Sequence, residues 1–379
     1  MQTTDILRQL ISFNTISSES NLGLIEWIEQ LLKEQGIYTE RLEDESGLPK
    51  ASLIARIGPA VEGGLILSGH TDVVPVKGQP WEDDPFVMRE TAETFIGRGV
   101  CDMKGFIASA IAGALQWKNL DLRKPVYLAF SYDEEVGCEK APRIAKRIVE
   151  LGGQKAWAII GEPTSLNPVV GQKGIVNIRT TLTGMAAHSS QILHQGLSAI
   201  HEGSKLVTCI EKVMQDLIDD GEINTDYNVP HSTLHVGMIS GGIAYNVLAR
   251  ECHLYWEIRN LPEQDIHSVL ARVQKYADEL CAKNTNLKIE TEFTSAVVPG
   301  LVNRNNDDLL TLLARHMDSK PGYVAYATEA GHFQQAGFQA VICGPGNIQQ
   351  AHQPEEWVAK SQLQDCDKLL DALVKDACL

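Results

Sequence analysis

Short apolar segments with the character of buried strands alternate with helical segments through the first half of this 379-residue chain. The clearest strand segments are GLILSGH, PVYLAFS and AWAIIGEP. Between them lie helical segments with apolar residues at helical spacing, such as NLGLIEWIEQLLKEQG and GFIASAIAGALQWKNL. This alternation predicts an α/β fold, in which a mostly parallel central sheet is flanked by helices on both faces.

A different pattern begins near residue 176 and lasts to about residue 297. The predicted order there is strand, helix, strand, strand, helix, strand, which is the order of a ferredoxin-like α+β domain. The α/β pattern then resumes, and the chain is long enough for two domains. We therefore expect a discontinuous first domain of residues 1–175 and 298–379, with residues 176–297 inserted into it.

Imidazole and carboxylate side chains follow several strand segments at the point where each strand ends. In open α/β sheets, ligands bind just beyond the carboxyl ends of the strands. Nitrogen and oxygen ligands of this kind suit zinc or a related divalent ion. Five ligands are too many for one open tetrahedral site, but they suffice for two ions if one carboxylate bridges them. The five candidate ligands are His70, Asp102, Glu162, His352 and one of the adjacent residues Glu134 and Glu135; the other glutamate and Asp72 lie beside them.

Three consecutive acids, Asp133, Glu134 and Glu135, follow one of the strand segments. Such a run is costly because like charges repel and burial penalises charge. Successive residues of an extended strand point in opposite directions, so we expect one glutamate to bind a metal ion and the other to transfer a proton. Asp72 lies two residues after His70, where its carboxylate can accept the second N–H of that histidine.

Composition narrows the class of partner. The eight cysteines are scattered without a CxxC pair, which argues against a thiolate zinc cluster and a disulfide scaffold. The net charge of −16 disfavours nucleic acid and anionic membranes as partners. No apolar stretch approaches the roughly 20 residues that span a bilayer, and the first residues lack the features of a signal peptide. The expected location is the cytoplasm.

Six motifs, in order along nearly the whole chain, resemble those of the co-catalytic zinc amidohydrolases and exopeptidases. That family includes acetylornithine deacetylase, succinyl-diaminopimelate desuccinylase, aminoacylase-1 and glutamate carboxypeptidase. Within it, the segments around GRGVCDMKGF, SYDEEVGC and TEAGHFQQAGFQAVICGPGNIQQAHQP are most similar to the acetylornithine deacetylases. The six motifs are SGHTDVVPV, GRGVCDMKGF, SYDEEVGC, GEPT, GMAAHSS and AHQPEE.

The resemblance implies two zinc ions per subunit, for which cobalt or manganese could substitute. His70 and Glu162 would bind the first ion. Glu135 and His352 would bind the second, and Asp102 would bridge the two. The first domain would then be the catalytic one, and the inserted domain would serve dimerisation and act as a lid.

The resemblance also assigns residues that act on the substrate. Glu134 would be the general base, and Asp72 would orient the metal-binding histidine. In the inserted domain, His188 would reach across a dimer interface to the substrate carbonyl. Asn246 and Arg259 would hold the substrate, the arginine by its α-carboxylate, although Arg259 could instead pair with a neighbouring acid such as the glutamate two residues before it.

The reaction that the resemblance implies is hydrolysis of N2-acetyl-L-ornithine to ornithine and acetate, a step of arginine biosynthesis, by a homodimer. Glu329 would pair with the side-chain ammonium of that substrate. The same catalytic residues would serve other N-acyl amino acids, such as acetylcitrulline, acetylmethionine or succinyl-diaminopimelate, or a dipeptide. A non-catalytic metal-binding protein or amino-acid-binding protein is disfavoured, because the full set of ligands and the base are present.

Overall fold

The computed structural model describes residues 1–192 and 194–379, which form two compact units. The larger unit consists of Met1–Val170, Asn303–Gly322 and Thr328–Leu379. The smaller unit consists of Gly171–Val302 and Tyr323–Ala327.

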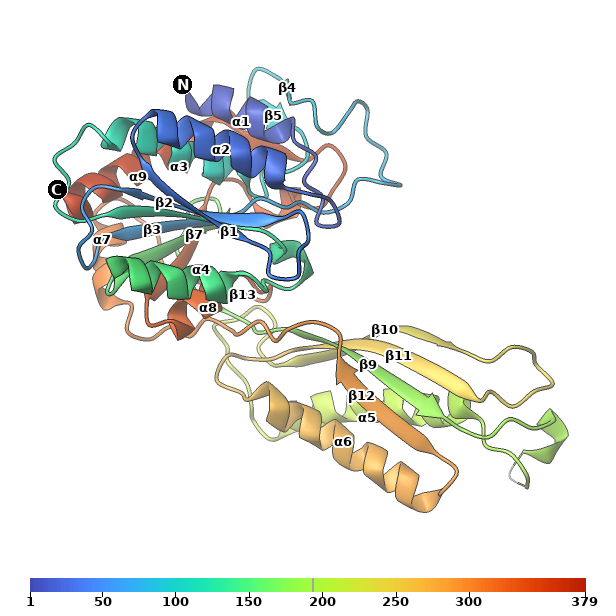
Figure 1. The fold of residues 1–379 in the computed structure, drawn as a ribbon. Coiled ribbons are helices and arrows are strands. Elements are labelled where there is room, and N and C mark those ends of the chain that lie inside the picture. Colours follow the sequence, from blue (N-terminus) through green and yellow to red (C-terminus); the bar gives the residue numbers. More distant parts are fainter. Residues whose placement is uncertain (193) are drawn as a thin grey trace. The chain divides into compact units, whose positions relative to one another are not determined.

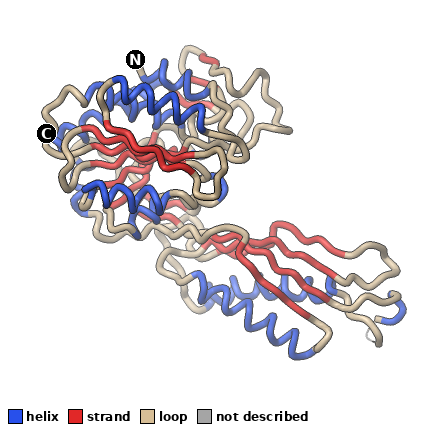
Figure 2. Tube along the Cα trace, in the orientation of Figure 1, coloured by secondary structure: helices blue, strands red, loops and turns tan. Residues whose placement is uncertain are grey.

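A mixed eight-stranded sheet forms the centre of the fold, in the order β1-β2-β6-β3-β7-β14-β8-β13 (Figures 1 and 2). The central strands β6, β3, β7 and β14 are parallel to one another, whereas β1 and β2 pair antiparallel at one side. The prediction of a mostly parallel central sheet is therefore confirmed. The strands are β1 (Tyr38–Glu43), β2 (Ala51–Ile57), β3 (Leu65–His70), β6 (Val126–Ser131), β7 (Trp157–Pro163), β8 (Val169–Gln172), β13 (Gly322–Val324) and β14 (Gln339–Gly344).

Helices cover both faces of this sheet, as Figure 1 shows: α1, α2, α3 and α9 lie on one face, and α4 and α8 on the other. Helix α7 packs against α9 and β14. Helix α3 is apolar around its circumference and buried over most of its length, so the residues just before it also lie inside the unit. The helices are α1 (Thr3–Ile11), α2 (Leu22–Glu34), α3 (Lys104–Trp117), α4 (Ala141–Ile148), α7 (Asp307–Ala314), α8 (Ala330–Gln335) and α9 (Lys360–Cys378).

A second, three-stranded sheet joins distant parts of the larger unit in the order β15-β5-β4. Its strands are β4 (Arg89–Glu90), β5 (Thr94–Ile96) and β15 (Trp357–Ala359). This pairing places the segment that follows His352 beside the segment that leads to Asp102. The sequence pattern did not predict this sheet.

The smaller unit is a four-stranded antiparallel sheet in the order β10-β11-β9-β12 with two helices, which is the ferredoxin-like arrangement that we expected. Strand β11 begins at Glu251, so Asn246 lies in the turn that precedes it. The elements are β9 (Val176–Thr183), α5 (Ala199–Asp219), β10 (Thr233–Gly241), β11 (Glu251–Arg259), α6 (Ile266–Lys283) and β12 (Lys288–Phe293).

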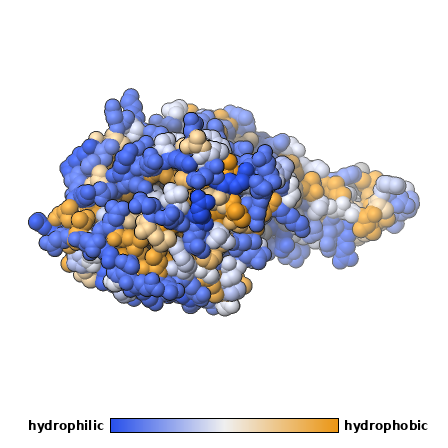
Figure 3. Space-filling view, turned by 90° about the horizontal axis from the view of Figure 1, so that it is seen from above, coloured by the Kyte–Doolittle hydropathy of each residue, from blue (hydrophilic) through white to orange (hydrophobic). Residues whose placement is uncertain are grey.

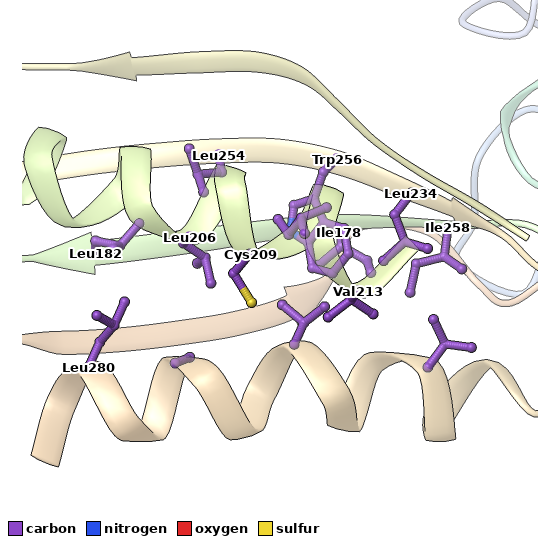
Figure 4. Packing of buried hydrophobic residues seen from close by; sticks show 14 of the residues in the cluster. Ile178, Leu182, Leu206, Cys209, Val213, Leu234, Leu254, Trp256, Ile258 and Leu280 are labelled. Atoms are coloured by element: carbon purple, nitrogen blue, oxygen red, sulfur yellow. The ribbon is translucent and has the colours of Figure 1, made fainter. Parts of the chain in front are cut away.

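On the face of the molecule shown in Figure 3, hydrophilic side chains cover most of the surface and apolar ones form separate patches. The core of the smaller unit is drawn in Figure 4, where apolar side chains of the sheet point toward those of α5 and α6. Alternate residues of β9 and β11 supply this core, because only one face of the sheet meets the helices. Among the residues that the structure describes, no helix combines the length and apolar character needed to cross a bilayer.

Candidate metal centre

Three neighbouring parallel strands bring the predicted ligands to one edge of the sheet. β3 ends at His70, and Glu162 is the last residue but one of β7, which pairs with β3. β6, on the other side of β3, ends at Ser131 just before the three acids. Because parallel strands end on the same side, these side chains converge at the carboxyl edge, where α/β sheets bind ligands.

The first group of donor atoms comprises His70, Asp102 and Glu162, all of them buried. His70 Nε2 lies 2.9 Å from Asp102 Oδ1 and 3.5 Å from Glu162 Oε1. One donor atom from each residue falls within 4.8 Å of the others. Glu162 Oε1 has no hydrogen-bond partner, which is costly for a buried carboxylate unless a cation meets it.

The second group comprises Asp102, Glu135 and His352, again with donor atoms within 4.8 Å of one another. His352 Nε2 lies 3.0 Å from Glu135 Oε2 and 3.3 Å from Asp102 Oδ2. Asp102 therefore belongs to both groups, and each of its two oxygens faces a different histidine. This is the arrangement that a bridging carboxylate requires.

The charges around these groups call for cations. Asp72, Asp102, Glu135 and Glu162 make ion pairs only with the two histidines among the residues that the structure describes. Hydrogen bonds with Asp102 and Glu135 raise the pKa of His352 to about 10. Burial raises the pKa of Glu162 well above its usual range, and the nearby carboxylates raise it further. Hard oxygen and imidazole donors with excess negative charge fit divalent metal ions.

Asp72 contacts His70 through its main chain and through the carboxylate that we predicted to orient this histidine. His70 Nδ1 lies 2.9 Å from the main-chain carbonyl of Asp72, whereas the carboxylate is 3.5 Å away. The carboxylate also accepts hydrogen bonds from the main-chain N–H groups of Glu134 and Glu135 and from the Ser17 hydroxyl. Asp72 therefore fixes both the histidine and the turn that carries the two glutamates.

The expectation that Glu134 and Glu135 lie on an extended strand is wrong. Strand β6 ends at Ser131, and Glu134–Val136 form one turn of 3₁₀ helix. The chain turns because Asp133 adopts a left-handed conformation with φ 64°. The two glutamates still diverge: only Glu135 enters a donor group, whereas Glu134 does not.

Glu134 has the surroundings of a group that exchanges protons. Burial raises the pKa of its carboxyl group well above the usual range, and the charges of Glu135 and Asp102 raise it further, against the effect of His70. The thiol of Cys138 donates toward Glu134 Oε1 at 3.4 Å. A carboxylate with a raised pKa is a stronger proton acceptor than an ordinary one, which suits a general base.

A lysine that the sequence analysis missed offsets the charge of the first acid in the run. Lys50 Nζ lies 2.6 Å from Asp133 Oδ1, and both side chains are largely buried. Lys50 also donates to the main-chain carbonyl of Ser17. No local signal links Lys50 to Asp133, because the two are 83 residues apart.

We predict that Lys50→Met destabilises the protein by about 3 kcal/mol, since it leaves a buried carboxylate without its partner. We expect a loss of stability at the lower end of the range for broken buried ion pairs. Burial already raises the pKa of Asp133, so the unpaired carboxylate can be neutralised by taking up a proton. Urea unfolding measures the change. The double variant Lys50→Met/Asp133→Asn should recover part of the stability; a double variant no more stable than the single one would contradict the pairing.

The structure places Glu329 beside the metal-binding groups but inside the larger unit. Only 1% of the residue is exposed, and its Oε2 accepts a hydrogen bond from Ser68 of β3. Burial raises the pKa of this carboxyl group. A contact between Glu329 and a substrate ammonium stays a prediction.

His188, Asn246 and Arg259 all lie in the smaller unit. His188 and Asn246 are exposed and close together, because His188 pairs with Val247 in an isolated antiparallel bridge. Ser189 N–H also donates to the Asn246 carbonyl at 2.9 Å. Arg259 Nε donates to Glu257 at 2.8 Å, which is the alternative pairing named above. Their roles toward a substrate stay predictions.

Imidazole and carboxylate donors in two groups that share one carboxylate, beside a further carboxyl group, are typical of metal-dependent hydrolases. Comparison with known proteins specifies the class further. The model of peptidase family M20/M25/M40 matches residues 66–376, and the chain belongs to this family.

Curated relatives cover nearly the whole chain. The chain is 32% identical over 382 residues to an acetylornithine deacetylase of Aliivibrio fischeri, covering 99% of this chain and 98% of that protein. It is 32% identical over 378 residues to an acetylornithine deacetylase of Pasteurella multocida, covering 97% of this chain and 96% of that protein. The similarity to acetylornithine deacetylases noted in the motifs is therefore confirmed.

Solved structures share the fold at low sequence identity. An M20 family metallo-carboxypeptidase from Sulfolobus solfataricus aligns with a TM-score of 0.79 and 16% identity, covering 99% of both chains. A dinuclear metal-binding peptidase of the M20 family from Bacillus subtilis aligns with a TM-score of 0.69 and 14% identity, covering 98% of this chain and 96% of that one. These two structures support the fold.

Proposed function

We propose that this hydrolase removes the acetyl group from N2-acetyl-L-ornithine, giving ornithine and acetate. The observation that carries the proposal is the pair of donor groups joined through Asp102, with Glu134 beside them, in a chain whose full-length relatives are acetylornithine deacetylases. The product ornithine assigns the enzyme to arginine biosynthesis, and we expect it in the cytoplasm.

His70, Asp102 and Glu162 would hold one divalent ion, and Asp102, Glu135 and His352 a second. We propose zinc as the native metal, which cobalt or manganese could replace. When bound, such ions polarise an acyl carbonyl and acidify water. Glu134 would take a proton from the attacking water and return it to the amine nitrogen as the C–N bond breaks.

The smaller unit would supply the contacts that orient the substrate. A guanidinium can grip a carboxylate through two hydrogen bonds, so Arg259 would bind the α-carboxylate after exchanging its present partner, Glu257. Asn246 would add a further hydrogen bond. His188, whose Nδ1 contacts Ser190 Oγ at 2.8 Å, would present its other nitrogen to the acyl oxygen. Glu329 would balance the charge of the ornithine ammonium.

A panel of acetylated ornithine, citrulline, methionine and glutamate tests the substrate assignment. We expect zinc-loaded protein to hydrolyse acetylornithine with a kcat/KM at least about tenfold above the others, a difference of about 1.4 kcal/mol in transition-state binding. Glu329→Gln should raise the KM for acetylornithine more than that for acetylmethionine. If another substrate has the highest kcat/KM, the proposed hydrolysis is supported but the proposed contact between Glu329 and the ornithine ammonium is wrong.

We propose that a second copy of the chain covers the outer strand of the smaller unit. Strand β10 lies at the edge of its sheet, where unpaired main-chain groups invite another strand. Met238 and Ile239 on this strand are 62% and 51% exposed, and Ile243 and Tyr245 just beyond it are almost fully exposed. Exposed apolar patches of this kind mark interaction surfaces.

Ile239→Lys should therefore convert a dimer into a monomer in sedimentation velocity, because a charge cannot be buried unpaired at the interface. If His188 acts across that interface, the monomer should also lose activity while it keeps its metal. Ile223→Lys changes an isoleucine that is 50% exposed elsewhere in the same unit and is the matched control. An Ile239→Lys protein that sediments like the wild type would count against this interface.

A further inference from the structure

A buried ion pair lies beside the metal-binding residues but belongs to neither donor group. Arg98 and Glu356 are each 1% exposed, and Arg98 Nη1 donates to Glu356 Oε2 at 2.6 Å. They are 258 residues apart in the sequence. The pairing of β15 with β5 brings their segments together. Burying two charges costs free energy, so a buried ion pair contributes little net stability. We therefore expect this pair to have another role.

The carboxylate of Glu356 holds the main chain that carries Asp102. Its Oε1 accepts hydrogen bonds from the N–H groups of Cys101 and Asp102, at 2.9 and 3.0 Å. Its Oε2 accepts a third from the N–H of Gly99 at 3.0 Å. Hydrogen bonds to a charged acceptor are stronger than neutral ones, so this loop is tied at three points.

The guanidinium of Arg98 extends the same network to the other histidine. Arg98 Nη2 donates to Gln79 Oε1 at 2.6 Å, and Gln79 Nε2 donates to the main-chain carbonyl of His352 at 3.0 Å. His352 has a left-handed backbone with φ 61°, which is unfavourable for a residue with a side chain. The hydrogen bond from Gln79 helps to hold it there.

We propose that Arg98 and Glu356 are positioning residues that set the separation of Asp102 from His352, and with it the affinity of the second donor group for its ion. The proposal rests on the dimetal function proposed above. Two of the three donors of the second group, Asp102 and His352, are attached to this network. In the first group only Asp102 is attached. The effect should therefore be selective.

Titration calorimetry of chelator-treated protein with Zn²⁺ alone tests this selectivity. Wild-type protein should bind two ions in two steps, and His352→Ala should identify the step that belongs to the second group. Glu356→Gln keeps the size of the side chain but turns an N–H₂ group toward donors. We expect it to weaken the second step by about 10- to 100-fold and the first by less than about threefold.

Two further variants keep the test independent of folding defects. Gln79→Ala removes the partly exposed side chain that joins Arg98 to the main chain of His352, but it leaves the hydrogen bonds of Glu356 in place. It should therefore weaken the second step alone. Arg98→Lys keeps the charge but lacks the planar guanidinium that contacts Glu356 and Gln79 together. It should also weaken the second zinc-binding step. Glu29→Gln is the matched control, since Glu29 is another little-exposed glutamate paired with an arginine, Arg41.

Unchanged zinc affinities in Glu356→Gln and Gln79→Ala, accompanied only by a lower melting temperature, would overturn the inference. Equal weakening of both steps would overturn it too, because a general loosening of the site is not positioning of the second group. A wild-type protein that binds fewer than two zinc ions would instead overturn the dimetal proposal itself. The visible spectrum of Co²⁺-loaded protein gives a second readout, since it reports the geometry around each ion.

Discussion

Replacing Glu134 by glutamine should leave a protein that binds both metal ions and hydrolyses almost no substrate. Glutamine has the same shape but cannot take a proton from water. General base catalysis contributes about 10²- to 10⁴-fold, so kcat for acetylornithine should fall by that factor. Metal content should stay at the wild-type value because Glu134 belongs to neither donor group.

Two measurements distinguish this result from a loss of folding or metal. Elemental analysis of the purified variant should give the same number of ions per chain as the wild type. Glu139→Gln, an exposed glutamate just beyond the same turn, should keep full activity. A Glu134→Gln protein with more than about a tenth of wild-type kcat would contradict the role of Glu134 as the base.

The parts of the site that could be predicted are those that regular structure places. His70 and Glu162 lie at the ends of buried strands, and the alternation of strands and helices implies that such ends meet at one edge of a parallel sheet. The alternation of strands and helices also predicted the mostly parallel central sheet. The ferredoxin-like fold of the smaller unit followed from the order of its expected strands and helices. The structure shows the alternating burial along β9 and β11 that such a one-sided sheet requires.

Other parts depend on contacts between residues far apart in sequence, which no local pattern encodes. The turn that separates Glu134 from Glu135 relies on the left-handed Asp133, and Lys50 pairs with that residue from 83 positions away. The support that Glu356 gives to Asp102 spans 254 positions. The hairpin of β1 and β2 was not predicted either. Most residues of β1 are polar and only partly buried, so its sequence lacks the alternation of apolar and polar residues that marks a strand.

Replacing Asp102 by asparagine should remove metal from both groups at once, since this residue alone contributes to each. An amide oxygen is a weaker ligand than a carboxylate and cannot offset the charge of two cations. We expect less than one zinc ion per chain. Activity should fall by roughly a thousandfold, because metal polarisation supplies several kcal/mol and each 1.36 kcal/mol is tenfold in rate.

The stability of the same variant gives an independent test. A ligand present at about 1,000 times its Kd stabilises a protein by about 4 kcal/mol, so zinc should raise the melting temperature of wild-type protein. That increase should be absent in Asp102→Asn and intact in Asp121→Asn, which changes an exposed aspartate. Comparing each variant with and without zinc cancels any direct effect of the substitution on folding. An undiminished zinc-induced increase in Asp102→Asn would show that the two groups bind metal without a shared carboxylate.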